Sequence, residues 1–175
     1  LLYVGRVAIE KNIQAFLDLD VPGRKVVVGS GPMLDTYKAA YPNVTFTGKL
    51  VGEVLADAYA SADVFVFPSL TDTFGIVLLE AIASGVPVAA FPVTGPIDNV
   101  TPGVTGALDQ DLAVAVSAAL ELDRARVREG ALSFSWENAA RMFIANIENA
   151  LFARQGRHVP QRKRRRLIKR RAEAR

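Results

Sequence analysis

The sequence predicts an α/β domain built on a Rossmann-like, doubly wound parallel sheet, with extra helices at its carboxyl-terminal end. Short runs rich in β-branched and aromatic residues alternate with segments of helical periodicity. Runs such as 26–28 and 64–67 are apolar at every position, as expected for strands that helices cover on both faces. The 175 residues are enough for one such domain with a substantial core.

Five strand patterns follow one another through the first half of the chain. They lie at residues 1–4, 25–28, 44–47, 63–67 and 87–91. Helical patterns begin between them, near Asn12, Met33, Gly52 and Phe74. Since a helix separates each strand from the next, right-handed crossovers should make the strands parallel.

The pattern after Pro96 is helical, and no further strand is expected there. Amphipathic helices are predicted at 112–122, 124–132 and 136–152, with Ser135 as the N-cap of the last. Trp136 and Phe143 fall on one face of that helix, where core packing is the simplest expectation.

Basic residues are concentrated at the end of the chain. Residues 154–175 contain eleven of the 21 lysines and arginines but only one of the 18 acidic residues. We therefore expect a folded domain over 1–153 and a basic, disordered tail over 154–175. The tail is either a solvated end or a segment that binds an anionic membrane surface. Nucleic acid is the weaker alternative, because the tail lacks interleaved aromatic residues and the body is acidic.

Composition excludes several classes of protein. The chain has no cysteine, which rules out disulfides and thiolate ligands and fits a cytoplasmic location. Its one histidine, His158, lies in the tail, so a catalytic triad or a histidine metal site is not expected. The longest apolar stretch, 75–93, is interrupted by Glu80 and Pro87 and does not resemble a membrane span. A start within a strand and without Met suggests a fragment that lacks an upstream portion.

Glycine and charged residues follow four of the predicted strands. In an open parallel sheet, ligands bind at the carboxyl ends of the strands, where the loops and helix amino termini converge. The segments at that edge are Gly5-Arg6, Gly29-Ser30-Gly31-Pro32, Thr47-Gly48-Lys49 and the loop from Ser69 to Gly75. This edge is therefore the predicted ligand site.

The residues at this edge favour an anionic ligand. A helix amino terminus presents unpaired amides with a partial positive charge, and the amides of Gly75 and Ile76 occupy that position in the predicted helix. Arg6 and Lys11 add two cationic donors. Together these groups are suited to phosphate.

Glu80 stands within a predicted helix that is apolar on nearly all sides. A carboxylate there needs hydrogen-bond donors. Ligand hydroxyls, such as those of a ribose, would supply them, and so would a structural arginine.

Two weaker patterns have simpler interpretations. Gly29-x-Gly31 lacks the third glycine and the acidic residue of a dinucleotide fingerprint. Asp18-Leu19-Asp20 imitates an acidic metal-binding pair, but it lies at a helix end, away from the predicted edge, where it should be solvated.

An ordered set of motifs resembles glycosyltransferase family four, in the carboxy-terminal donor-binding domain of the GT-B fold. The set consists of Gly5-Arg6-x4-Lys11, Gly29-Ser30-Gly31-Pro32, Val44-x-Phe46-x-Gly48 and Pro68-Ser69-x2-Asp72-Thr73-Phe74-Gly75-Ile76-Val77-Leu78-Leu79-Glu80-Ala81-x2-Ser84-Gly85-x-Pro87-Val88. Each motif alone is weak evidence for the family, whereas the ordered series of motifs from residue 1 to about 150 is specific to it.

The resemblance implies a role for each matching residue. It makes Arg6, Lys11 and Asp72 catalytic: the first two would hold the donor diphosphate, and the third the hydroxyls of the transferred sugar. Glu80 would contact the ribose, and Gly48-Lys49-Leu50 the nucleobase. The remaining donor contacts would come from Gly5, Gly31, Phe74, Gly75, Ile76 and Val77.

The resemblance further implies a hexosyltransferase that uses a UDP- or GDP-sugar, retains the anomeric configuration, and needs neither a cofactor nor a metal. Its acceptor would be a lipid or glycan, held by an amino-terminal domain that is missing here. Asp72 departs from the family, whose first acidic residue is usually Glu, and this puts the identity of the hexose in doubt. Two alternatives stay open: a nucleotide-sugar epimerase of the same fold and a non-catalytic nucleotide-sugar binding module.

Overall fold

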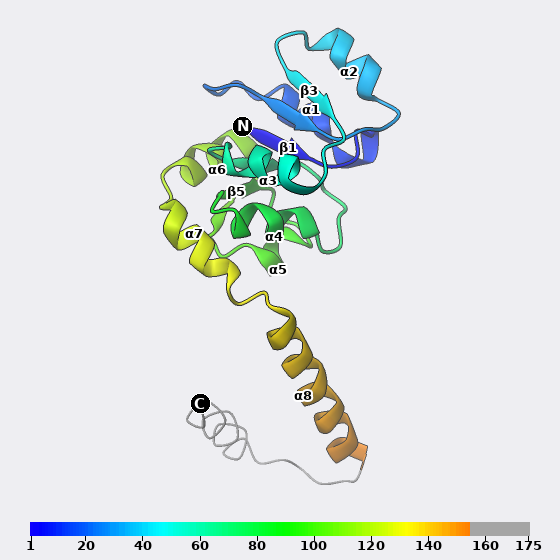
Figure 1. Cartoon of the computed structure of the whole chain (residues 1–175), viewed down its shortest axis with the longest axis vertical. Coiled ribbons are helices and arrows are strands. Elements are labelled where there is room, and N and C mark those ends of the chain that lie inside the picture. The colour runs from blue at the N-terminus through cyan, green and yellow to red at the C-terminus, as the bar shows by residue number, and fades with distance from the viewer. Residues whose placement is uncertain (155–175) are drawn as a thin grey trace. The chain divides into compact units, whose positions relative to one another are not determined.

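The computed structural model describes residues 1–154, which form two compact units (Figure 1). The first unit is Leu1–Leu132, and the second begins at Ser133. Only the first residue of the predicted tail, 154–175, falls within the described residues.

The first unit is built on a six-stranded parallel sheet with the order β3-β2-β1-β4-β5-β6. The strands are β1 (Leu2–Val4), β2 (Val26–Val28), β3 (Thr45–Gly48), β4 (Phe65–Phe67), β5 (Val88–Ala90) and β6 (Gly106–Leu108). All their pairings are parallel. The predicted doubly wound sheet is thus confirmed, and the first five strands lie where the sequence placed them to within two residues.

The expectation of no strand after Pro96 was wrong. Strand β6 pairs with β5 at the edge of the sheet, with Gly106 opposite Val88. A Cβ atom on Gly106 would lie 2.3 Å from the Val88 carbonyl oxygen, so the absence of a side chain allows this close pairing. Glycine and alanine have little strand propensity, and only packing against β5 makes this segment extended.

Seven α-helices connect and cover the strands of the first unit. They are α1 (Ile13–Leu17), α2 (Leu34–Ala40), α3 (Gly52–Ala60), α4 (Ile76–Ala83), α5 (Pro96–Asn99), α6 (Leu112–Leu120) and α7 (Arg124–Ala131), with a 3₁₀ turn, η1 (Ile9–Lys11), before α1. The first four α-helices begin within two residues of the predicted positions. Asp111 and Asp123 cap α6 and α7 by accepting hydrogen bonds from backbone amides.

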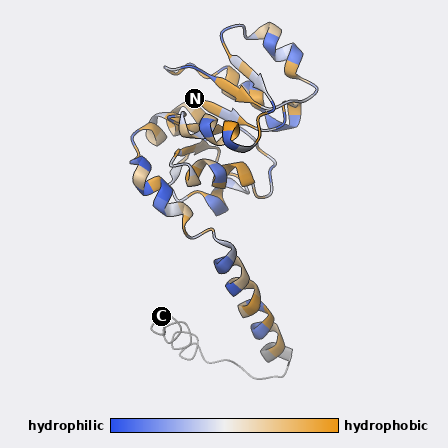
Figure 2. Cartoon of the chain, in the orientation of Figure 1, coloured by the Kyte–Doolittle hydropathy of each residue, from blue (hydrophilic) through white to orange (hydrophobic). Residues whose placement is uncertain are grey.

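Two apolar clusters bury the two faces of the sheet. One contains Phe65 and Phe67 of β4, packed with residues of α4 and α7. The other contains Val64 and Val66, packed with residues of α1 and α6. Adjacent residues of one strand therefore enter opposite cores, which explains the unbroken apolar run. Hydrophobic residues make up much of the sheet in the first unit (Figure 2).

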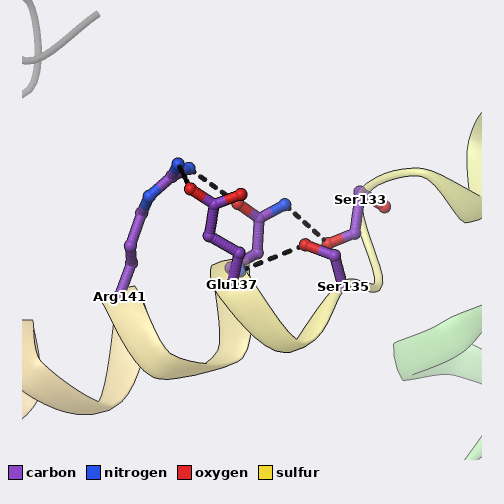
Figure 3. A network of polar contacts seen from close by, with 5 residues as sticks. Ser133, Ser135, Glu137 and Arg141 are labelled. Carbon is purple, nitrogen blue, oxygen red and sulfur yellow. Dashed lines mark hydrogen bonds and ion pairs between the residues drawn. The ribbon is translucent and has the colours of Figure 1, made fainter.

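The second unit contains α8 (Trp136–Arg154). Ser135 caps it as predicted, because its hydroxyl accepts the Asn138 amide at 3.1 Å. An ion pair between Arg141 and Glu137 adds to this network (Figure 3). The expectation that Trp136 and Phe143 belong to a core was wrong. They are 92% and 66% exposed, since the described part of this unit offers α8 no second element to pack against.

Candidate functional site

Two adjoining hollows lie at the carboxyl ends of the strands. The larger, of about 530 Å³, lies at the ends of β1, β2 and β3. The smaller, of about 230 Å³, lies between the ends of β1 and β4 and the start of α4. Val4, Gly5 and Arg6 line both. The larger volume is within the range of small-molecule sites.

Close backbone packing shapes the wall of the larger hollow. The Gly5 amide donates to the Val28 carbonyl, and the Val7 amide donates to the Ser30 carbonyl, both at 3.0 Å. A Cβ atom on Gly29 would lie 1.8 Å from the Gly5 oxygen, and one on Gly31 would lie 2.2 Å from the Val7 oxygen. Packing of one turn on the next therefore requires glycine at both positions. The sequence suggested only that these glycines let a ligand approach the backbone.

An ion pair crosses the smaller hollow. Lys11 Nζ lies 2.6 Å from Asp72 Oδ1, and each side chain is about a quarter exposed. The other carboxylate oxygen, Oδ2, and the hydroxyl of Ser69 are buried and have no hydrogen-bond partner among the described residues.

The charge of Asp72 is maintained by these neighbours. Burial alone would raise its pKa, but hydrogen bonding to Lys11, the nearby Ser69 hydroxyl and the positive charge of Lys11 outweigh burial and hold the pKa below its ordinary value. Ser69 acts on the carboxylate although the geometry between them is not that of a full hydrogen bond. Asp72 is consequently ionised at neutral pH.

Side chains from both halves of the sheet fix the loop between β4 and α4. The Asn12 amide group donates to the Pro68 carbonyl at 2.9 Å, and that of Asn99 donates to the Phe74 carbonyl. Gly75, with φ +73°, precedes the first residue of α4. The helix thus starts two residues later than predicted, and its first amides are those of Ile76 and Val77.

Arg6 leaves the sheet edge with most of its side chain accessible. The Arg6 side chain is 64% exposed, and among the described residues its guanidinium forms only a surface ion pair with Glu10, at 3.5 Å. Such pairs are weak and readily exchanged for a stronger anion. The Tyr3 hydroxyl donates to the Arg6 carbonyl at 2.9 Å and holds the backbone at this position.

Glu80 is more exposed than the sequence suggested. The buried Tyr59 hydroxyl donates to Glu80 Oε2 at 2.8 Å. The expectation of a carboxylate surrounded by apolar residues was wrong, because the face of α4 that carries Glu80 is open to solvent. A tyrosine takes the place of the structural arginine that the sequence left as an alternative.

Comparison with known proteins identifies the family. The family model described as "Glycosyl transferases group 1" matches residues 1–122. The chain belongs to this family. Within it, the chain is 44% identical over 108 residues to a GDP-mannose-dependent alpha-mannosyltransferase of Mycobacterium tuberculosis, covering 61% of the chain and 29% of the relative. It is 35% identical over 136 residues to the alpha-monoglucosyldiacylglycerol synthase of Streptococcus pneumoniae, covering 69% and 31%.

Solved structures show the same fold at lower identity. The apo lipopolysaccharide outer core galactosyltransferase WaaB superimposes with a TM-score of 0.70 at 21% identity, over 87% of this chain and 48% of that one. This group 1 chain thus has the fold of a GT-B carboxy-terminal domain, and it spans about a third of the length of the two curated relatives.

The hollows bring together most of the residues that the sequence singled out. Gly31, Lys49 and Leu50 line the larger hollow, and Lys11, Asp72, Gly75, Ile76 and Val77 line the smaller, with Gly5 and Arg6 in both. Gly48, Phe74 and Glu80 line neither. The sequence did not predict the contacts of Asn12, Asn99 and Tyr59 or the buried hydroxyl of Ser69. Ser69 stands within the motif quoted for the family, whereas the other three gave no local signal.

No group of three His, Cys, Asp or Glu side chains is arranged to hold a metal ion within 1–154. In the same part of the chain, no helix has the length and apolar character needed to cross a membrane.

Proposed function

We propose that this chain is the donor-binding half of a retaining hexosyltransferase. It would bind a UDP- or GDP-sugar and support transfer of the sugar to a hydroxyl of a lipid or glycan. Family membership supports the transferase class. The GDP-mannose dependence and the glucosyldiacylglycerol named for two relatives support the donor and acceptor classes.

The observation that carries the proposal is the pair of hollows that share Arg6. A nucleoside in the larger hollow and a hexose in the smaller would place the connecting diphosphate beside Arg6 and the start of α4. Asp72 and Ser69, which line the smaller hollow, would then lie beside the hydroxyls of the sugar.

The chemistry required of these residues is stabilisation of a departing diphosphate. Negative charge grows on the leaving group as the glycosidic bond breaks, and fixed donors aimed at that charge lower the barrier. Arg6, Lys11 and the first amides of α4 are such donors. Lys11 would bind the phosphate while keeping Asp72 in place. In our proposal no metal is needed for this step, and the leaving phosphate accepts the proton of the acceptor hydroxyl on the same face.

The acceptor half would come from an amino-terminal domain outside this chain. We expect the isolated chain to bind donor but to perform little transfer. We further propose a cytoplasmic enzyme that binds an anionic membrane surface through residues 154–175, which lie almost entirely outside the described part of the structure. The absence of cysteine supports a reducing compartment. We do not propose a nucleic-acid role.

Calorimetry with UDP, GDP, ADP and their sugars on the 175-residue chain tests donor binding. Arg6→Ala should lower the affinity for nucleoside diphosphates by at least about 10-fold, since a charge-assisted hydrogen bond contributes about 1.5–3 kcal/mol. In the full-length enzyme the same change should lower kcat by about 10² to 10³. Arg24→Ala removes an exposed arginine away from both hollows and is the matched control. Unchanged affinity and turnover in Arg6→Ala would remove Arg6 from the mechanism.

Product analysis separates the remaining alternatives. The full-length protein incubated with labelled donor and acceptor should yield a glycosylated acceptor of retained configuration. An epimerase would instead release a free or epimerised sugar without an acceptor. A non-catalytic module would bind donor and return it unchanged.

A further inference from the structure

Glu80 has an unusual partner for a carboxylate. Its Oε2 accepts from the hydroxyl of Tyr59, whereas no hydrogen bond or ion pair within residues 1–154 engages Oε1. An arginine could have occupied both oxygens and neutralised the charge. The neutral hydroxyl holds one oxygen and leaves the other as a charged acceptor.

Tyr59 is held rigidly. It is 2% exposed and belongs to the core cluster that also contains Phe65, whose ring centroid is 5.8 Å from its own. Burial, followed by the hydrogen bond to Glu80, raises the pKa of Tyr59 well above its ordinary value, so the hydroxyl keeps its proton and acts as a donor. The orientation of the hydroxyl is therefore fixed by the core and not by solvent.

Glu80 lies beside the site although it lines neither hollow. Residues three and four apart share one face of a helix, so Glu80 follows Val77 and Ile76 along α4. Those two residues line the smaller hollow. Tyr59 approaches from α3, the helix that follows the segment with Lys49 and Leu50, which line the larger hollow. The pair thus joins α3, which follows a segment that lines the larger hollow, to α4, which begins at the smaller hollow.

We propose that Tyr59 is a positioning residue whose buried hydroxyl fixes Oε2 of Glu80 so that Oε1 is presented to the ribose hydroxyls of the bound nucleotide. This inference rests on the proposed function, because it assumes a ribose near Glu80. A site built to hydrogen-bond a hydroxyl rejects an analogue that lacks it, and this selectivity depends on how firmly the acceptor is held.

The test compares two ligands on the 175-residue chain by calorimetry. The ligands are UDP or GDP, whichever the wild type binds more tightly, and its 2′,3′-dideoxy analogue. The wild type should prefer the ribonucleotide by about 10-fold or more, since hydrogen bonds to a charged group are among the stronger ones. Tyr59→Phe should reduce this preference to about 3-fold or less while leaving the affinity for the dideoxy analogue unchanged.

Tyr41→Phe is the matched control. Tyr41 also donates to a carboxylate, Asp18 Oδ1 at 2.5 Å, but neither residue lines a hollow. Tyr41→Phe should leave the affinities for the ribonucleotide and for its dideoxy analogue unchanged. Glu80→Gln should reduce the ribose preference at least as far as Tyr59→Phe.

The outcomes are distinguishable. A full ribose preference in Tyr59→Phe, or equal weakening of both ligands, would overturn the positioning role. Nucleotide binding without ribose preference in the wild type would overturn the inference alone, whereas no nucleotide binding at all would overturn the proposed function. If Tyr59→Phe does not fold, wild type labelled with 3-fluorotyrosine replaces it. The Tyr59 fluorine resonance must then shift with the ribonucleotide and not with the dideoxy analogue.

Discussion

Substitution of Gly31 by alanine tests whether this glycine serves packing or the ligand. Its new Cβ atom would lie 2.2 Å from the Val7 oxygen and 2.8 Å from the Val7 nitrogen, well inside contact distance. Val7 cannot yield, because it is buried and its amide and carbonyl bond Ser30 and Met33.

The expected cost combines three effects. Overpacking costs about 1–3 kcal/mol, and each strained hydrogen bond adds about 0.5–1.5 kcal/mol. Alanine also lowers the conformational entropy of the unfolded chain relative to glycine, which stabilises the folded state by about 0.4–1 kcal/mol. Gly31→Ala should therefore lower the free energy of unfolding by about 3 kcal/mol.

Gly48→Ala is the appropriate control. Gly48 has φ +77°, but a Cβ atom there would meet no atom within 4 Å. Only left-handed strain remains, which costs about 1–2 kcal/mol. Urea titration followed by far-ultraviolet circular dichroism measures both variants; the single tryptophan, Trp136, belongs to the second unit and is a poor probe of the first. Equal losses in the two variants, or a fully stable Gly31→Ala that no longer binds nucleotide, would refute the packing argument.

Two further predictions concern the smaller hollow. Lys11→Met should lower the free energy of unfolding by about 1 kcal/mol at pH 7, between the values for exposed and buried ion pairs. Because the pKa of Asp72 is held down, its stabilising contribution is present above about pH 4 and is lost as the pH falls through the folded-state value, so wild type and variant should converge in acid. A difference that persists unchanged in urea titrations at pH 3 would contradict this. Asn99→Ala should cost about 1–3 kcal/mol by leaving the Phe74 carbonyl unpaired, and should speed amide exchange in residues 69–75. Unaltered exchange there would mean that Asn99 does not fix the loop.

The sequence predicted the strands with strong patterns and missed the one without. Runs such as Val64–Phe67 have high strand propensity and two buried faces, so their conformation follows from local chemistry. Strand β6 begins with glycine and alanine and exists because β5 offers it an edge. Long-range pairing of this kind leaves no local pattern to read.

The candidate site also contains some features that the sequence predicts and others that it does not. Glycines and charged residues after strands are visible in the sequence, because parallel topology brings such positions to one edge. The hydrogen bond from Tyr59 to Glu80 and the ion pair between Lys11 and Asp72 join residues 21 and 61 positions apart. Which distant side chain satisfies a given carboxylate is decided by helix placement, which periodicity does not specify.

The pairing of β1 with β4, in the middle of the sheet, has the fewest paired residues of any strand pair in the sheet. Strand β1 meets β4 through a single paired position, Leu2 with Phe65, whereas β1 pairs β2 at three. Two contacts between side chains and the opposite loop, from Lys11 to Asp72 and from Asn12 to Pro68, reinforce this pairing at one end. A bound molecule that contacts residues on both sides would add a third connection between β1 and β4. Ligand binding in the hollows should therefore stabilise the pairing of the two halves of the sheet.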